Sequence, residues 1–180
     1  MLKWKSMPPL VRIPLIYGLI GGVICVVLLI SFYYFGKHPL LIPPFFDVRI
    51  FVIAILSFFA LKEVRDYFFG GIIFLWQGMG GCLVFLGGLA LVTSIGIWIF
   101  GTAVPGFVEL YVAQGIAQIK SLPAESVNQI GKQAVEEVLK TLPTTTLGDL
   151  IGKYASQTFA IGFFITIIIS VILRRQPKPI

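Results

Sequence analysis

Four long apolar stretches, each ending in charge or in proline and glycine, most constrain what this sequence can fold into. They cover residues 13–35, 45–61, 72–100 and 159–173. A helix rises about 1.5 Å per residue, so crossing a hydrocarbon core about 30 Å thick takes about 20 residues. The second stretch is a little short, and the third is long enough to tilt. The pattern predicts an all-α polytopic membrane protein with four transmembrane helices, three within residues 13–100 and the fourth over 157–173.

The composition fits a chain whose solvent is lipid. Hydrophobic residues make up 57% of it and charged residues 12%, with a mean hydropathy of +0.96. The chain is therefore far more apolar than a soluble domain of similar length. The net charge of +6 is spread beside the apolar stretches, so we expect anionic lipid headgroups to be the partner of the basic residues, and no nucleic acid.

The placement of the basic residues predicts the orientation of the chain. Only Lys37 and Arg49 flank the short loop between the first two apolar stretches. Because basic residues concentrate on the cytoplasmic side, both termini are predicted to be cytoplasmic, with residues 1–12 as an interfacial lead-in and 174–180 as a basic tail. The basic residues on that side are Lys3, Lys5, Arg12, Lys62, Arg65, Arg174, Arg175 and Lys178.

Residues 101–156 form a sizeable segment outside the apolar stretches, and the alternation of spans places it on the periplasmic side. Pro105 and Pro123 are predicted to open two amphipathic helices, because apolar residues recur after each at helical spacing. Thr146 is predicted to cap a last helix that continues into the fourth span. We expect this segment to pack on itself as a cap over the bundle; binding a partner or lying on the lipid surface are the alternatives.

Small residues at four-residue spacing predict where the spans pack against one another. In lipid, close approach of helix backbones takes over from the hydrophobic effect, and small side chains permit it. The first span offers Gly18 and Gly22, and the fourth offers Gly162, Thr166 and Ser170 on one face. Packing within one bundle accounts for them, and self-association into a homo-oligomer is the alternative.

No reactive constellation is present in the sequence. The central parts of the four stretches lack ionisable residues, which usually mark transport paths in hydrocarbon. Asp47 and Arg49, at the outer start of the second span, are expected to form an interfacial charge pair. His38, the single histidine, has no cysteine or acid cluster at ligand spacing, and no glycine run matches a phosphate loop. We therefore predict no catalytic, cofactor-binding or metal-binding residues, and a protein that is not an enzyme.

A loop motif carries a family resemblance. Arg65-Asp66 leads through Tyr67-Phe68-Phe69 to Gly70-Gly71 and Ile72-Ile73-Phe74, followed by Gln77-Gly78. The motif resembles that of a small bacterial membrane family known as domain of unknown function 4199. The resemblance covers about residues 10–175 and implies a four-span architecture in a cell inner membrane, with no activity attached. One departure is that many members carry an acid at the start of the last span, where this chain has Gln157 or Thr158.

The same motif has a physical interpretation as an inner elbow. A charge pair between Arg65 and Asp66 would anchor the turn at the headgroups, while Gly70 and Gly71 would let the backbone reverse before the third span. We expect a structural role, with a docking surface for a cytoplasmic partner as the alternative. The candidate elbow residues are Arg65, Asp66, Gly70, Gly71, Phe74 and Gly78.

Together these observations predict a non-enzymatic accessory or scaffold subunit of the inner membrane, or a small homo-oligomer. The alternative is a permeation or lipid-handling protein that works as an oligomer. The sequence names no ligand, partner or stoichiometry.

Overall fold

The computed structural model describes residues 7–43 and 46–174, and all regular structure in these ranges is helical. The all-α prediction is therefore confirmed. Lys3, Lys5, Arg175 and Lys178 lie outside the described residues, as do half of the predicted lead-in and nearly all of the predicted tail. The helices are α1 (Pro9–Tyr34), α2 (Arg49–Glu63), α3 (Leu75–Ala103), α4 (Phe107–Lys120), α5 (Ala124–Ile130), α6 (Lys132–Thr141) and α7 (Leu147–Leu173), with 3-10 turns at Pro39–Leu41 and Leu142–Thr144 and a π-helical turn at Val64–Phe68.

Three helices, α1, α3 and α7, are long and apolar enough to cross a membrane. They contain 26, 29 and 27 residues. Local chemistry sets two of their starts: Pro9 opens α1 without losing a helical hydrogen bond, and Thr146 caps α7. The Thr146 hydroxyl accepts a hydrogen bond from the backbone N–H of Asp149 at 3.3 Å, and the Asp149 carboxylate accepts one from the N–H of Thr146 at 2.8 Å. The predicted cap, and the helix that continues from it into the last apolar stretch, are confirmed.

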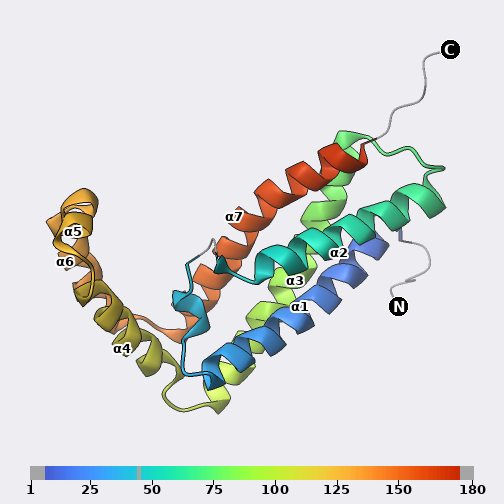
Figure 1. Cartoon of the computed structure of the whole chain (residues 1–180). Coiled ribbons are helices and arrows are strands. Elements are labelled where there is room, and N and C mark those ends of the chain that lie inside the picture. The colour runs from blue at the N-terminus through green and yellow to red at the C-terminus, as the bar shows by residue number, and fades with distance from the viewer. Residues whose placement is uncertain (1–6, 44–45, 175–180) are drawn as a thin grey trace.

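The long helices and α2 lie side by side in a bundle with two distinct ends (Figure 1). At the elbow end, α1 begins, the turn from α2 to α3 reverses the chain, and α7 finishes. At the arm end, α1 and α3 finish, α7 begins, and α4 leads away from the bundle. The helix α2 has only 15 residues and begins at Arg49, not at 45 as the apolar stretch predicted. It packs between α1 and α7, and the π-helical turn prolongs it by five residues.

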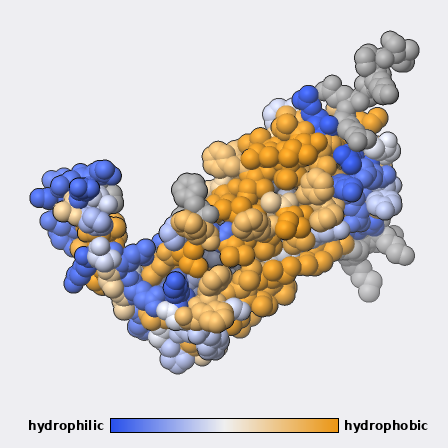
Figure 2. Space-filling model, viewed as in Figure 1, coloured by the Kyte–Doolittle hydropathy of each residue, from blue (hydrophilic) through white to orange (hydrophobic). Residues whose placement is uncertain are grey.

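The bundle interior is mainly apolar and holds three clusters of buried side chains along its length. A middle cluster surrounds Phe85, and an elbow-end cluster surrounds Leu61. An arm-end cluster joins the linker between α1 and α2 to α4. Figure 2 shows that apolar residues also cover the outside of the bundle, with hydrophilic residues at its two ends. A helical bundle that is apolar both inside and outside is typical of a membrane span.

An arm made of α4, α5 and α6 extends from one end of the bundle (Figure 1). Its base is anchored, because Phe107 and Tyr111 of α4 are buried in the arm-end cluster. The helix expected after Pro123 is interrupted at Gly131, whose φ of 96° is a conformation that favours glycine. The prediction of one continuous helix was wrong there, since this glycine breaks it into α5 and α6.

Candidate functional site

The most concentrated polar chemistry within the bundle lies where α2 begins. Asp47 and Arg49 form an ion pair there, with the Nε of Arg49 donating to a carboxylate oxygen of Asp47 at 2.6 Å. The other carboxylate oxygen of Asp47 accepts the backbone N–H of Arg49 at 2.9 Å. The side chains of Arg49 and Asp47 are only 6% and 11% exposed. The expected pair therefore forms, but it is buried among helices.

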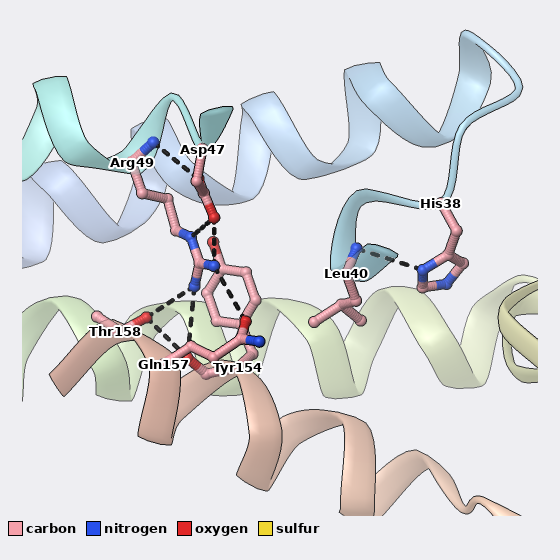
Figure 3. A network of polar contacts seen from close by, with 7 residues as sticks. All are labelled: His38, Leu40, Asp47, Arg49, Tyr154, Gln157 and Thr158. Carbon is pink, nitrogen blue, oxygen red and sulfur yellow. Dashed lines mark hydrogen bonds and ion pairs between the residues drawn. The ribbon is translucent and has the colours of Figure 1, made fainter. Parts of the chain in front are cut away.

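The guanidinium of Arg49 also binds α7 (Figure 3). One terminal nitrogen donates to the Thr158 hydroxyl at 3.0 Å and to the backbone carbonyl of Tyr154 at 3.4 Å. The other donates to the Gln157 side-chain carbonyl at 3.3 Å and pairs with Asp47. The guanidinium carbon lies 3.9 Å from the centre of the Tyr154 ring, a cation–π contact. We call these five residues the arginine clamp: Asp47, Arg49, Tyr154, Gln157 and Thr158.

Every N–H donor of the Arg49 side chain has an acceptor in the arginine clamp. Arginine has five such donors, and a buried donor left without an acceptor is costly. The clamp therefore holds its charge in a fully bonded state and joins the start of α2 to α7, more than 100 residues away in the chain. These are the contacts of a structural junction, since the guanidinium bonds to groups on both helices.

Two neutral members of the arginine clamp, Gln157 and Thr158, lie at the start of the last apolar stretch and accept from the Arg49 guanidinium. Asp47 supplies the negative charge from the other side of the guanidinium.

His38 is the second buried polar group near the arm end. Its ring lies 4.7 Å from the Phe107 ring and 5.1 Å from the Tyr111 ring, centre to centre. Nδ1 accepts the Leu40 N–H at 3.4 Å (Figure 3). Burial among these rings lowers the pKa of His38 from 6.5 to about 4, an effect that the backbone of Phe107 partly opposes and the charge of Lys153 reinforces. His38 is therefore neutral at pH 7 and serves as a core side chain.

Gln114 of α4 ties the linker that follows α1 to the arm. Its amide nitrogen donates to the Gly36 carbonyl at 2.9 Å, and its amide oxygen accepts the His38 backbone N–H at 2.8 Å. Nothing in the sequence marked Gln114, because a single glutamine on a helix is usually solvated. Beside these contacts, the linker and α4 enclose a groove of about 640 Å³.

The predicted elbow residues meet at the opposite end of the bundle. Arg65 donates from Nε to a carboxylate oxygen of Asp66 at 2.6 Å, and one of its terminal nitrogens approaches the Leu173 carbonyl, the end of α7, at 3.5 Å. Gly70 and Gly71 have φ of 60° and 84°, and the N–H of Gly71 closes the turn on the Arg65 carbonyl at 2.8 Å. The Arg65–Asp66 pair thus tightens a turn made within a π-helical segment, which the sequence did not predict.

The other two members of the elbow motif serve α3. Phe74 precedes the helix, and its N–H donates to the Gln77 side chain at 3.1 Å. Gly78 lies one turn further on, where an added Cβ would come within 3.0 Å of the Ser170 hydroxyl. The motif therefore divides between the turn itself and a helix contact.

The predicted packing residues lie at helix contacts. A Cβ at Gly18 would come within 2.3 Å of the Phe85 backbone oxygen, and one at Gly22 within 2.6 Å of Val92. A Cβ added at Gly162 would come within 2.3 Å of the Leu86 side chain. Thr166 and Ser170, on the same face of α7, are buried. These small side chains bring α1 and α7 against α3.

No metal-binding chemistry accompanies these contacts in the part of the chain that the structure describes. Residues 7–43 and 46–174 hold no group of three or more histidine, cysteine or acidic side chains placed to share an ion. Cys25 and Cys82 are buried, free thiols.

The fold and its contacts define an all-helical protein whose long apolar helices are compatible with an integral membrane protein. A family model described as "Protein of unknown function (DUF4199)" matches residues 16–175, and the chain belongs to this family. Comparison with curated proteins and with solved structures gave no match.

Proposed function

We propose that this chain is a non-enzymatic accessory or scaffold subunit of a cell inner membrane, with four crossings, cytoplasmic termini and a periplasmic arm. The observation that carries the proposal is the combination of a closed bundle with an arm that extends beyond it (Figure 1). Such a shape suits a protein that holds partners in place.

The fourth crossing would be made by α2 together with its π-helical turn. Arg49–Glu63 and Val64–Phe68 contain 15 and 5 residues, a sum of 20. That length matches the about 20 residues that a hydrocarbon core requires. Arg49 near one end and Arg65 near the other are each paired with an aspartate, which lowers the cost of holding these charges close to the hydrocarbon.

The orientation follows from the charges at the two ends of the bundle. Four basic residues lie at or near the elbow end: Arg12 on α1, Lys62 on α2, Arg65 in the π-helical turn and Arg174 just after α7. The concentration of basic residues on cytoplasmic loops favours that end as cytoplasmic. The arm, at the opposite end, would then be periplasmic.

The closed interior favours a scaffold over a pore within one protomer. Phe85, Leu86 and Leu89 have no exposed surface in the middle of the bundle. The charges of the arginine clamp bond one another and leave no row of free polar groups for an ion to follow. Permeation would therefore require a path between protomers.

The arm offers an apolar surface that a partner could cover. A hollow of about 170 Å³ between α4 and α6 is lined by Ile119, Leu122, Ala134, Val135 and Val138. Val138 is apolar but 43% exposed, and the neighbouring Glu137 is also exposed. The apolar lining on one side and polar residues such as Glu137 on the other make the arm amphipathic, which is the form expected of a helix that meets a protein or a lipid surface.

Photo-crosslinking with native mass measurement tests this role. A photoreactive residue replacing Val138 should join the chain to one companion protein at fixed stoichiometry, and the same residue replacing Glu137 should crosslink much less. Native mass spectrometry of the detergent extract should give the same companion and ratio. A monomer with no crosslink from position 138, or a closed ring of identical chains around a wet axis, would refute the scaffold.

The groove of about 640 Å³ at the base of the arm favours a second candidate, an oligomeric lipid-handling or permeation protein. In that case α4 would form a wall shared between protomers. Cryo-EM of the extract separates the candidates, because a homo-oligomeric ring with the grooves facing its axis supports this second one.

A further inference from the structure

The groove at the base of the arm has the size of a ligand site. It holds about 640 Å³, within the range of about 300–1,000 Å³ that ligand pockets occupy. One wall comes from the end of α1 and the linker after it, and the other from α4. Apolar side chains dominate its lining, chiefly Phe32, Leu41, Ile42, Phe46 and Ala117.

The charge of the groove is positive. Lys37 is the one charged residue among the described residues that line it, and its side chain is exposed. His38 is neutral at pH 7, as its lowered pKa requires. Gln114 also lines the groove, but its amide already bonds Gly36 and His38. An occupant would therefore present a long apolar body and one anionic group.

The groove is held in shape by contacts of its own. Gly36 turns the chain with φ of 78°, and Gln114 fastens the backbone on both sides of Lys37 to α4. A wall fixed in this way does not need to be ordered when a ligand arrives, so less binding free energy is lost.

The groove also borders the lipid-facing surface. Tyr34 and Phe35, at the end of α1, are 73% and 82% exposed, and Phe46 of the groove lining is 79% exposed. Aromatic side chains collect where acyl chains meet headgroups. The outside of the bundle is apolar and gives way to hydrophilic residues at the arm end (Figure 2), so the groove at that end lies where acyl chains would meet headgroups.

We propose that this groove binds one anionic glycerophospholipid from the adjoining leaflet. An acyl chain lies along Phe32, Ile42 and Phe46, and the phosphate group lies at Lys37. This inference rests on the bundle being embedded in lipid and not on the scaffold role. A failed search for a companion protein therefore leaves it standing, and the loss of the lipid site would leave the scaffold proposal standing.

Native mass spectrometry of the full chain, exchanged into nanodiscs with equal amounts of phosphatidylglycerol and phosphatidylcholine, tests the site. The wild type should retain one phosphatidylglycerol per protomer, with a preference of about fivefold over phosphatidylcholine, as one lysine near an anionic lipid supplies. K37E should abolish the preference, because it reverses the charge at the phosphate. A117W should remove the retained lipid of either kind, because it fills the groove from an exposed position on α4.

K132E is the matched control, since Lys132 is an exposed lysine on the arm away from the groove. It should retain lipid as the wild type does, and circular dichroism should give all variants equal helix content. Equal retention of both lipids by the wild type, or unchanged retention in A117W, would overturn the proposal. A protein segment crosslinked into the groove at Phe46 would overturn it as well.

Discussion

Replacing Arg49 by methionine should destabilise the protein by about 3–5 kcal/mol, the cost of removing one partner of a buried ion pair. The variant loses the bonds from the guanidinium to Asp47, Gln157, Thr158 and the Tyr154 carbonyl. The Asp47 carboxylate, which is only 11% exposed, then keeps one hydrogen bond within the clamp, the one from the backbone N–H of residue 49. Methionine fills a similar volume, so most of the loss is electrostatic and not a cavity.

A double variant separates the charge from the packing. D47N/R49M has no buried charge at this place, so it should be more stable than R49M by about 2 kcal/mol. R49K keeps the charge but lacks the planar fork that reaches α7, so its loss should lie between those of the wild type and R49M.

The measurement is the free energy of unfolding in mixed micelles, titrated with sodium dodecyl sulfate and followed by far-ultraviolet circular dichroism. K132M is the control, because Lys132 is an exposed lysine on the arm that lines neither the clamp nor the groove, and its loss should change stability by less than about 0.5 kcal/mol. If R49M unfolds within about 0.5 kcal/mol of the wild type, or if D47N/R49M is no more stable than R49M, the buried charges of the clamp do not stabilise the fold in the way described.

Three further outcomes are expected in the same titration. G18A should lose about 1–3 kcal/mol, because its Cβ would meet the Phe85 backbone oxygen at 2.3 Å, whereas G87A, with nothing within 4 Å, should change little; equal effects would refute the packing of α1 on α3. T146A should lose about 1 kcal/mol with the α7 cap, and T146S should keep it; a neutral T146A would show that the cap does not stabilise α7. His38 is neutral at pH 7 in the folded protein, because its pKa is lowered from 6.5 to about 4. The stability of the folded state is therefore not reduced by His38 above pH 6.5, and it falls as the pH drops from 6.5 through 4, where the unfolded chain binds the proton more readily. Lowering the pH should cost the wild type about 2 kcal/mol more than H38N after allowance for water near the ring, and parallel pH profiles would contradict the burial of this histidine.

Local signals in the sequence predicted several features because each depends on near neighbours. The long apolar runs predicted the three long helices, and Thr146 predicted the cap of α7. The two-residue spacing of Asp47 and Arg49 predicted their ion pair. The family assignment also followed from a local motif, Arg65 to Gly78, and the family model matches it.

Features that join distant segments could not be read in this way. Arg49 binds Thr158 from 109 residues away, and no spacing rule connects them. His38 looked like a loop residue, but rings from α4 enclose it. Apolar periodicity continued through Gly131, where the backbone takes a φ of 96° and breaks the helix. In each case tertiary packing or one glycine decided the outcome against a reasonable local pattern.

The most direct test of the central claim, four crossings with the arm opposite the termini, is cysteine labelling in intact cells. Cys25 and Cys82 are buried and are replaced by alanine, and single cysteines are placed by K132C on the arm and K62C near the elbow. A maleimide that cannot cross the inner membrane should label K132C before lysis, and K62C only after the membrane is opened. Labelling of both positions from the same face would contradict the fold's proposed placement in the membrane.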